Sequence, residues 1–367
     1  MNQTEIYYTL ALLQLPGIGS LLARKLIERT GSAEAVFKTN RTKLEATPGI
    51  GPLLAKSIST HKPFDLVEKE LRLVEQHQIQ LFHFKDENFP LRLRQCPDHP
   101  LILFGKGALP LNVNRIVAVV GTRAATDYGR QLTEALIQGL ISLNVLVISG
   151  LAYGIDIHAH RLALKHQLPT VGVLGHGLGR IYPAVHKTVA ERMLEQGGLL
   201  TEFLYDTGPD KENFPKRNRI VAGMADAVVV VEAATNGGAL ITASIANDYN
   251  RDVFAFPGRV GDKYSSGCHA LVRNHKAALI TSADELCEAM GWLQSPNKPA
   301  AYQTMLFPEL EQDEQLVYEL LKNQGQMGID LLSMQVGFST TRLSHALLGL
   351  EFKGLLRALP GKQFVIN

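Results

Sequence analysis

The sequence has few cysteines and no long apolar run, and each shortage excludes a class of protein. Its three cysteines, Cys96, Cys268 and Cys287, lie far apart and form no CxxC pair. This spacing fits neither a disulfide-stapled secreted fold nor a zinc site. The longest apolar run, 227–231, is far shorter than the roughly 18 residues of a membrane span, so no membrane association is predicted. The start MNQTEIYYTL lacks a secretory pattern, so we expect a cytoplasmic protein.

An excess of charge of one sign is also absent. Lys and Arg number 37 against 35 Asp and Glu, which leaves a formal net charge of +2. A nucleic-acid-binding role would therefore depend on local clusters of cations and not on the overall charge. The composition, 46% hydrophobic and 20% charged, is ordinary for a packed globular protein, and the length of 367 residues predicts two or three domains.

Residues 1–62 contain two similar turns, LPGIGS at 15–20 and TPGIGP at 47–52, each followed by an apolar-periodic stretch with basic residues. Proline opens each turn, and the glycines supply backbone freedom. The paired turns resemble the helix-hairpin-helix repeat, whose hairpin amides can face a DNA phosphate. We predict a small helical domain of this helix-hairpin-helix or SAM-like type. A packing hairpin without a ligand is the slightly favoured interpretation of its turns.

Residues 66–290 alternate between strand-like and helix-like segments. The strand-like segments are short and almost continuously apolar, as expected for strands buried on both faces of a sheet. They lie at 116–120, 144–149, 169–174, 197–202, 227–232 and 252–257, with further candidates for edge strands at 79–84 and 101–105. Helical patterns separate them at 127–142, 154–167, 184–197 and 239–250. This alternation predicts an α/β fold with an extended Rossmann-like, doubly wound, mostly parallel sheet, although the strand order is not readable.

The C-terminal part begins with a polar, proline-containing segment, 291–307, that is typical of a linker. Residues 308–367 contain three helical patterns and two terminal strand-like runs, which predicts a winged-helix domain. Its third helix would expose a sparse basic set, namely Thr341, Arg342, His345 and Lys353. A DNA-reading helix usually carries more positive charge, so we favour a protein-interaction or dimerisation role over DNA contact.

The first core strand runs into Gly121, Thr122 and Arg123. The segment 119–130 contains only two glycines and is neither a dinucleotide fingerprint nor a P-loop, so no nicotinamide cofactor is expected. A glycine lets backbone N–H groups approach an anion, threonine adds a hydroxyl donor, and arginine grips phosphate with two nitrogens. Ligands of open α/β sheets bind at this edge, which predicts an anion site. The alternative is that Arg123 pairs with a core carboxylate.

Two more glycine-rich segments follow strands, at 149–160 and 175–186, and the second supplies Arg180. In the first, Asp156 and His160 lie four residues apart on one helical face, so an acid–base or metal pair is conceivable. No third ligand lies near them in the sequence. We therefore favour a structural hydrogen-bonded pair and predict no catalytic and no metal-ligating residue.

The segment 211–227 is the most informative. Its cations surround one aromatic residue: Lys211, Lys216, Arg217 and Arg219 around Phe214. Such interleaving suits a single strand, whose bases stack on rings while cations follow the phosphates; a duplex would hide the base faces. Arg217 and Arg219 point about 200° apart on a helix, so we expect one of them to organise the core. The alternative is a solvated helix start with Phe214 as a staple.

Two later segments bear on the same crevice. Arg259 and Lys263 could add phosphate contacts to one of its walls. The segment 232–244 is similar to the PGGxGTxxE loop of phosphoribohydrolase-like Rossmann enzymes. That loop needs a glutamate one turn into its helix, and 239–244 contains no carboxylate. A nucleotide-processing enzyme is therefore the second hypothesis, and a duplex-binding regulator that uses the winged helix is the third.

Six motifs in chain order carry a family resemblance: GTRAATDYG, SGLAYGIDIHAH, GHGLGRIYP, FPKRNRIVAG, NGGALITA and FPGRVGDKYSSG. Over about 115–280 they resemble the DprA/Smf family of DNA-processing proteins, and the flanking domains fit that family too. The resemblance implies a cytoplasmic protein that binds and protects incoming single-stranded DNA during natural transformation. It also implies help in loading the RecA recombinase, a homodimer formed through the Rossmann domain, and neither catalysis nor a cofactor.

The resemblance also implies site residues. The family's anion-pocket residues fall on Gly121, Thr122 and Arg123, and its lysine and phenylalanine fall on Lys211 and Phe214. The chain departs from the family pattern where NGGALITA replaces SGSLITA. It departs again at Cys268, which replaces an asparagine, and at 275–276, where His-Lys precedes the alanines. The second departure puts the local pocket wall in doubt.

Overall fold

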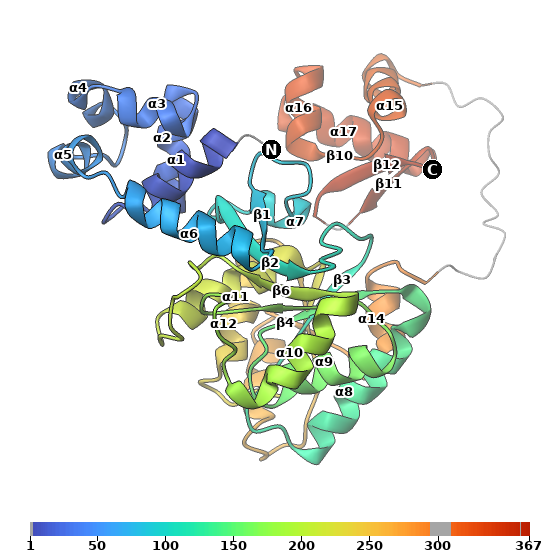
Figure 1. The fold of residues 1–367 in the computed structure, drawn as a ribbon. Coiled ribbons are helices and arrows are strands. Elements are labelled where there is room, and N and C mark those ends of the chain that lie inside the picture. Colours follow the sequence, from blue (N-terminus) through green and yellow to red (C-terminus); the bar gives the residue numbers. More distant parts are fainter. Residues whose placement is uncertain (1–2, 294–309, 360) are drawn as a thin grey trace. The chain divides into compact units, whose positions relative to one another are not determined.

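The structure, a computed structural model, describes residues 3–293, 310–359 and 361–367. It divides into two compact units, Met1–Leu286 and Cys287–Asn367 (Figure 1). Each unit has its own hydrophobic core. Within the described ranges, no helix combines the length and the apolar composition that crossing a bilayer requires. Most of the predicted linker lies outside the described residues, and the predicted domain boundaries stay predictions.

Short helices make up the N-terminal part of the first unit. They are α1 (Gln3–Leu13), α2 (Ser20–Thr30), α3 (Ala33–Lys38), α4 (Arg41–Glu45), α5 (Pro52–Thr60) and α6 (Phe64–Gln76). In the two Pro-Gly-Ile-Gly turns, Gly17 and Gly49 have positive φ angles of 81° and 92°. A Cβ atom on Gly17 would meet Leu54, and one on Gly49 would meet Leu22. Each turn therefore packs against the helix that follows the other turn.

A nine-stranded sheet in the order β1-β2-β6-β5-β4-β3-β7-β8-β9 forms the centre of the first unit. Strands β3 to β9 are parallel, and β1 and β2 add an antiparallel edge beside β6. The bounds are β1 (Gln80–His83), β2 (Ile102–Gly107), β3 (Ile116–Val120), β4 (Leu146–Ser149), β5 (Thr170–Val173), β6 (Gly198–Thr201), β7 (Ala227–Val230), β8 (Asp252–Ala255) and β9 (Ala278–Leu279). The predicted doubly wound, mostly parallel sheet is confirmed. Strand β9 is not predictable from the sequence, because its two residues carry no periodic signal.

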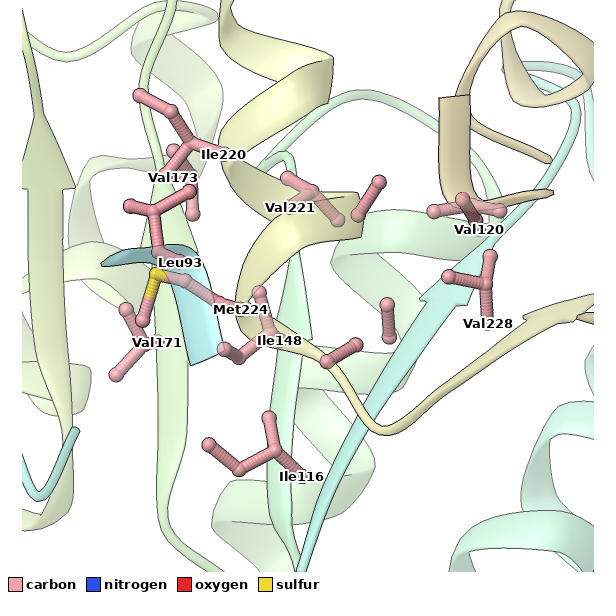
Figure 2. Close-up of a cluster of buried hydrophobic side chains, with 14 of the residues drawn as sticks. Leu93, Ile116, Val120, Ile148, Val171, Val173, Ile220, Val221, Met224 and Val228 are labelled. Carbon is pink, nitrogen blue, oxygen red and sulfur yellow. The ribbon is translucent and has the colours of Figure 1, made fainter. Parts of the chain in front are cut away.

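Helices connect the strands and cover the sheet. They are α7 (Leu91–Arg94), α8 (Asp127–Gly139), η1 (Ile141–Leu143), α9 (Ile155–Lys165), η2 (Ala184–His186), α10 (Lys187–Gln196), α11 (Asn213–Met224), α12 (Gly238–Asp248), α13 (Ser266–Arg273) and α14 (Ala283–Ala289). Helix α11 packs on the sheet through a fully apolar cluster. Figure 2 shows its members, Ile116, Ile148, Val171 and Val228 on the strands and Ile220, Val221 and Met224 on the helix. Leu93 of α7 completes this cluster and is fully buried, which stabilises the fold by ~1.5–3 kcal/mol.

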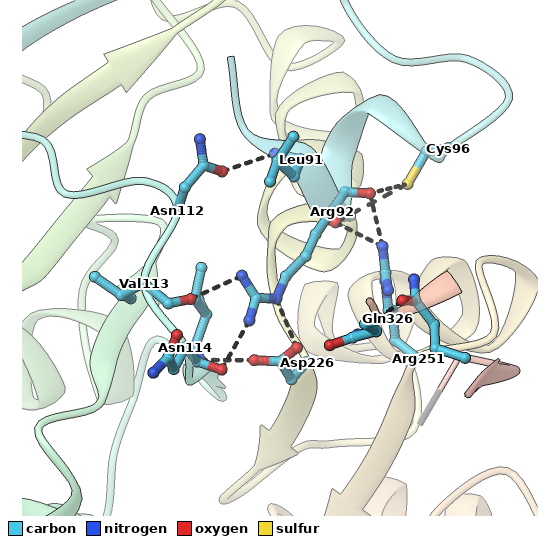
Figure 3. Close-up of polar contacts among 12 residues, drawn as sticks. Leu91, Arg92, Cys96, Asn112, Val113, Asn114, Asp226, Arg251 and Gln326 are labelled. Carbon is cyan, nitrogen blue, oxygen red and sulfur yellow. Dashed lines mark hydrogen bonds and ion pairs between the residues drawn. The ribbon is translucent and has the colours of Figure 1, made fainter. Parts of the chain in front are cut away.

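The segment before β3 is tied to the sheet through Arg92 (Figure 3). The Arg92 guanidinium pairs with Asp226 at 2.6 Å and donates to the carbonyl oxygens of Val113 and Asn114, both at 2.9 Å. The second carboxylate oxygen of Asp226 accepts a hydrogen bond from the N–H of Ile116 at 2.8 Å. Helix α7 is thereby joined to the start of both β3 and β7.

The second unit confirms the predicted winged helix. It contains α15 (Gln312–Gln324), α16 (Ile329–Val336), α17 (Thr340–Phe352) and a three-stranded sheet of β10 (Met327–Gly328), β12 (Gln363–Ile366) and β11 (Leu356–Leu359). Arg342 of α17 makes a double hydrogen bond to Asp313, at 2.6 Å for both contacts, and Lys353 pairs with Glu314. Two of the cations expected to be exposed on the third helix are therefore paired with carboxylates of the same unit.

Candidate nucleic-acid interface

The strand order creates a crevice at one edge of the sheet. The chain leaves β3 toward β4 and later returns to the other side of β3 as β7, so the loops after β3 and β7 diverge. Ligands of doubly wound sheets bind at this point, outside the carboxyl ends of the strands. A cavity of about 700 Å³ lies here. Its lining includes Gly121, Thr122, Arg123, Asp156, Tyr182, Lys211, Phe214, Arg217, Gly237 and Thr242.

Glu232, which is not among the predicted site residues, shapes the loop after β3. Its carbonyl oxygen accepts from the N–H of Thr122 at 2.7 Å. Its buried carboxylate accepts from the N–H of Thr126 at 3.0 Å and also from the Thr126 hydroxyl. Thr126 is the N-cap of α8, and its hydroxyl accepts from the N–H of Gly129 at 3.1 Å. The available signal is an acidic residue directly after an apolar, strand-like run.

The loop after β3 also packs closely against the start of α9. The N–H of Ile155 donates to the carbonyl oxygen of Thr122 at 3.2 Å. Gly154 has a positive φ of 77°, and a Cβ atom there would lie 2.1 Å from that carbonyl oxygen. A side chain at Gly121 would likewise meet Ile155. Glycine is therefore needed at both positions for the close packing of these two loops.

Arg123 and Phe214 lie together at the cavity. The guanidinium carbon of Arg123 is 5.5 Å from the centroid of the Phe214 ring, a cation–π arrangement. Arg123 is exposed, Phe214 is partly exposed on the first turn of α11, and Lys211 is exposed just before that helix. Within the described part of the chain, Arg123 forms no ion pair with a carboxylate. The alternative of a core-paired Arg123 is therefore not observed.

Arg217 lies on the buried side of the cavity. Its Nη1 donates to the carbonyl oxygen of Val173 at 2.5 Å, and its Nε donates to Asn218 at 3.1 Å. Burial lowers the pKa of Arg217 to about 10, and the neighbouring Asp156 carboxylate opposes this shift. Burial also raises the pKa of Asp156, against the effect of Arg217. The cavity thus has a buried cation and a buried acid side by side.

Arg219 does not line the cavity and is bonded to other groups of the first unit. Its guanidinium pairs with Glu202 and donates to the carbonyl oxygen of Asp98 at 2.6 Å, with only 14% of its side chain exposed. Glu202 is itself largely buried, and burial raises its pKa against the effect of Arg219. Both arginines of 217–219 are therefore bonded to core groups, whereas only one was expected to be. Arg219 is bonded in the core because the largely buried carboxylate of Glu202 faces it.

The remaining predicted cations lie outside the cavity lining. Arg180 is exposed and donates to the carbonyl oxygen of Asp206 at 3.4 Å. Lys216 is exposed on α11, and Arg259 and Lys263 are exposed in the loop after β8. Of the predicted site, the cavity brings together Gly121, Thr122, Arg123, Lys211, Phe214 and Arg217.

Asp156 and His160 do not form the predicted hydrogen-bonded pair, so that prediction is wrong. Asp156 accepts from the N–H of Gly150 at 3.1 Å, and His160 Nδ1 lies 2.7 Å from the Thr170 hydroxyl. Burial lowers the pKa of His160 to about 3, which keeps its ring neutral. No cluster of three or more His, Cys, Asp or Glu side chains in the described ranges could hold a metal ion.

Comparisons with known proteins cover all three parts of the chain. Residues 80–291 match the family of DNA recombination-mediator protein A. Residues 301–362 match the DprA winged helix domain, and residues 9–59 match the SAM-like helix-hairpin-helix tandem.

Individual relatives agree with these matches. Protein Smf of Escherichia coli (strain K12) is 36% identical over 307 residues, which cover 82% of this chain and 80% of that protein. The X-ray structure of DNA processing protein A from Streptococcus pneumoniae has a TM-score of 0.68 at 32% identity, and the match covers 77% of this chain and 97% of that one. DNA processing protein A from Helicobacter pylori, whose structure was described for a unique single-stranded DNA binding mode, has a TM-score of 0.53 at 29% identity. Its match covers 58% of this chain and 95% of that one.

Proposed function

The chain belongs to the DNA recombination-mediator protein A family, and from this membership we propose that its Rossmann-like part binds single-stranded DNA in the cavity beside β3 and β7. One observation carries the proposal. Arg123 lies 5.5 Å from the ring of Phe214 at this cavity, so a cation and a partly exposed aromatic face are offered together. In a bound single strand, a phosphate can pair with such a cation while a base stacks on such a ring.

The phosphate would bind between the loop after β3 and the start of α11. Gly121 and Thr122 contribute backbone and hydroxyl donors, while Arg123 and Lys211 contribute exposed positive charge. Arg217 adds a charge from the buried side, where water screens it least. Lys216, Arg180, Arg259 and Lys263 would steer the strand from farther away.

The ring of Phe214 supports a preference for single strands. A base can stack on an exposed ring only when its face is free, and a duplex covers both faces of its bases. Stacking tolerates all four bases, because each has a π face. We therefore propose binding that is selective for single strands but tolerant of sequence.

Binding without chemical alteration is also part of the proposal. Asp156 is the carboxylate-bearing side chain that lines the cavity within the described ranges, and it is buried beside Arg217. The helix after Gly237-Gly238 carries no carboxylate in its first turns, where a phosphoribohydrolase-like enzyme has its glutamate. These features favour a binding protein that is not an enzyme over the nucleotide-processing alternative.

We further propose that the protein protects incoming DNA during natural transformation and helps to load RecA. We propose in addition that it acts as a homodimer formed through its Rossmann-like domain. Family membership supports these roles. The winged helix fits a protein partner better than DNA, because Arg342 and Lys353 are already paired with Asp313 and Glu314.

Fluorescence anisotropy tests the proposal on the full chain. A labelled 20-nucleotide oligo-dT and a duplex of the same length are titrated over one salt series. We expect tighter binding of the single strand and a steep fall of affinity with salt. Equal affinity for both would overturn the single-strand claim. Incubation with nucleoside monophosphates tests the absence of catalysis, because appreciable release of free base would favour the enzyme.

A further inference from the structure

Two half-exposed tyrosines lie in the loops that follow β4 and β5, the two strands that come after β3 on one side of the sheet. Tyr153 follows β4 and is 48% exposed, and Tyr182 follows β5 and is 47% exposed. Rings exposed to this extent offer part of a flat apolar surface on which another planar group can stack. Neither tyrosine belongs to the set of cations and Phe214 that the proposed function uses.

Tyr182 adjoins that set directly. Its side chain lines the cavity, and its ring centroid lies 6.2 Å from that of Phe214, with 40° between the ring planes. The backbone around it is held in place, because the N–H of Tyr182 donates to Nε2 of His176 at 3.3 Å. The two rings are tilted and not stacked on each other, so one face of Tyr182 can accept another planar group.

Tyr153 continues the same edge. Its ring meets His186 edge-on, with 5.0 Å between the ring centroids, and Nδ1 of His186 lies 2.9 Å from the carbonyl oxygen of Leu151. A Cβ atom on the next residue, Gly154, would meet the backbone of Thr122 and Arg123, so the two loops lie close together. Neighbouring parallel strands lie about 4.8 Å apart, so the loops after β3, β4 and β5 are within reach of consecutive nucleotides of one strand.

We propose that Tyr182 and Tyr153 are stacking platforms for the bases next to the one on Phe214, so that the single strand follows the β3–β4–β5 edge of the sheet. The inference rests on the proposed function. To the phosphate contacts and the stacking on Phe214, this inference adds two further base contacts along the β3–β4–β5 edge. Since tyrosine rings carry no charge, these contacts strengthen binding without adding to its salt dependence.

The decisive comparison uses variants at Tyr182 on two ligands, oligo-dT and an abasic strand of equal length. Loss of one base–aromatic stack costs about 1–3 kcal/mol, so Tyr182→Ala should weaken oligo-dT binding at least fivefold. Tyr182→Leu should weaken it similarly, whereas Tyr182→Phe should bind as the wild type does. Tyr153→Ala should show the same pattern. All variants should keep the wild-type salt slope, and on the abasic strand they should bind as tightly as the wild type.

Ile141→Ala is the matched control. Ile141 is 40% exposed on η1, which precedes β4 and therefore lies at the opposite edge of the parallel sheet. Its replacement should change neither ligand's affinity. A 2-aminopurine placed along the strand gives a direct readout, because stacking quenches its fluorescence. The quenching should persist with Tyr182→Phe and decrease with Tyr182→Ala.

The outcomes separate this inference from the proposed function. If both tyrosine-to-alanine variants bind oligo-dT like the wild type while Arg123→Ala binds weakly, the stacking path is wrong and the proposed function stands. An equal loss on oligo-dT and on the abasic strand would assign the tyrosines a structural role and also overturn the path. If the wild type itself shows no preference for single strands, the proposed function fails.

Discussion

Glu232 accepts hydrogen bonds from both the backbone N–H and the hydroxyl of Thr126. The carboxylate is buried after β7, whereas Thr126 closes the loop that follows β3. The pair therefore joins two neighbouring strand ends on either side of the crevice, and the loop of Gly121, Thr122 and Arg123 is fixed between them.

Replacing Glu232 should weaken DNA binding although the residue does not line the cavity. Glu232→Ala removes both acceptors and leaves the N–H and the hydroxyl of Thr126 without them, which should lower the free energy of unfolding by ~1–3 kcal/mol. The loosened loop should weaken single-strand binding about tenfold, as measured by anisotropy. Glu285→Ala is the matched control, because Glu285 accepts the same two kinds of hydrogen bond from Thr281. Unchanged affinity in Glu232→Ala would disprove a positioning role.

Arg123→Ala should weaken binding of oligo-dT and reduce its salt dependence. Loss of one phosphate contact should lower the slope of log K against log salt by about 0.7 for a single strand. Arg130→Ala serves as control, since Arg130 is an exposed arginine of α8 that pairs with Asp127 and does not line the cavity. An identical slope in Arg123→Ala and the wild type would mean that Arg123 contacts no phosphate.

Arg219 and Lys216, three residues apart on α11, should respond in opposite ways. Arg219→Gln breaks a largely buried ion pair with Glu202 and should lower the free energy of unfolding by about 3 kcal/mol, with an unchanged salt slope. Lys216→Gln removes an exposed charge, so its stability should stay within about 0.5 kcal/mol of the wild type while its salt slope decreases. Urea unfolding and anisotropy measure the two effects. Reversal of the pattern would assign Arg219 to DNA.

His160 makes folding sensitive to acid. Its pKa falls from the ordinary 6.5 to about 3 because burial disfavours the charged ring. The stability that comes from the neutral ring is present above pH 6.5 and is lost as the pH falls from 6.5 toward 3, by up to ~1.4 kcal/mol per pH unit. Asp156 and Glu202, whose pKa values are raised by burial, act in the opposite direction in acid.

We therefore predict that the pH dependence of the free energy of unfolding differs between the wild type and His160→Gln. Urea unfolding of the wild type and of His160→Gln is measured from pH 7.5 down to pH 4.5. We expect the curve of unfolding free energy against pH to be flatter for the variant. Parallel curves would contradict the assignment of this acid sensitivity to His160.

The sequence predicted the elements of the fold better than their arrangement. Strands such as β3 and β7 were readable because sheet residues buried on both faces form continuous apolar runs. The strand order was not readable, because pairing of β3 with β7 joins residues more than 100 positions apart. Helix α13 was missed, since its Ser-Gly-Cys-His start lacks a helical apolar pattern.

In the candidate site, too, the sequence predicts individual residues better than the contacts between them. The chemistry of Arg123 and Phe214 predicts both as site residues, and the structure places them in contact. The same chemistry predicts Arg219, but its partner Glu202 follows a different strand, and only the folded chain brings the two together. Tyr153 and Tyr182 are not predictable in this way, because the exposure of an aromatic side chain cannot be read from the sequence.

The hydrogen bonds and the ion pair of Arg92 indicate which part of the chain can fold alone. A fragment that starts at residue 115, just before β3, would lose the Arg92 partner of Asp226. It would also lose the fully buried side chains of Phe89 and Leu93 and leave a hole against α11. The parallel strands therefore depend on α7 and the segment before it for part of their core, and we expect that an autonomously folding fragment has to begin before Phe89.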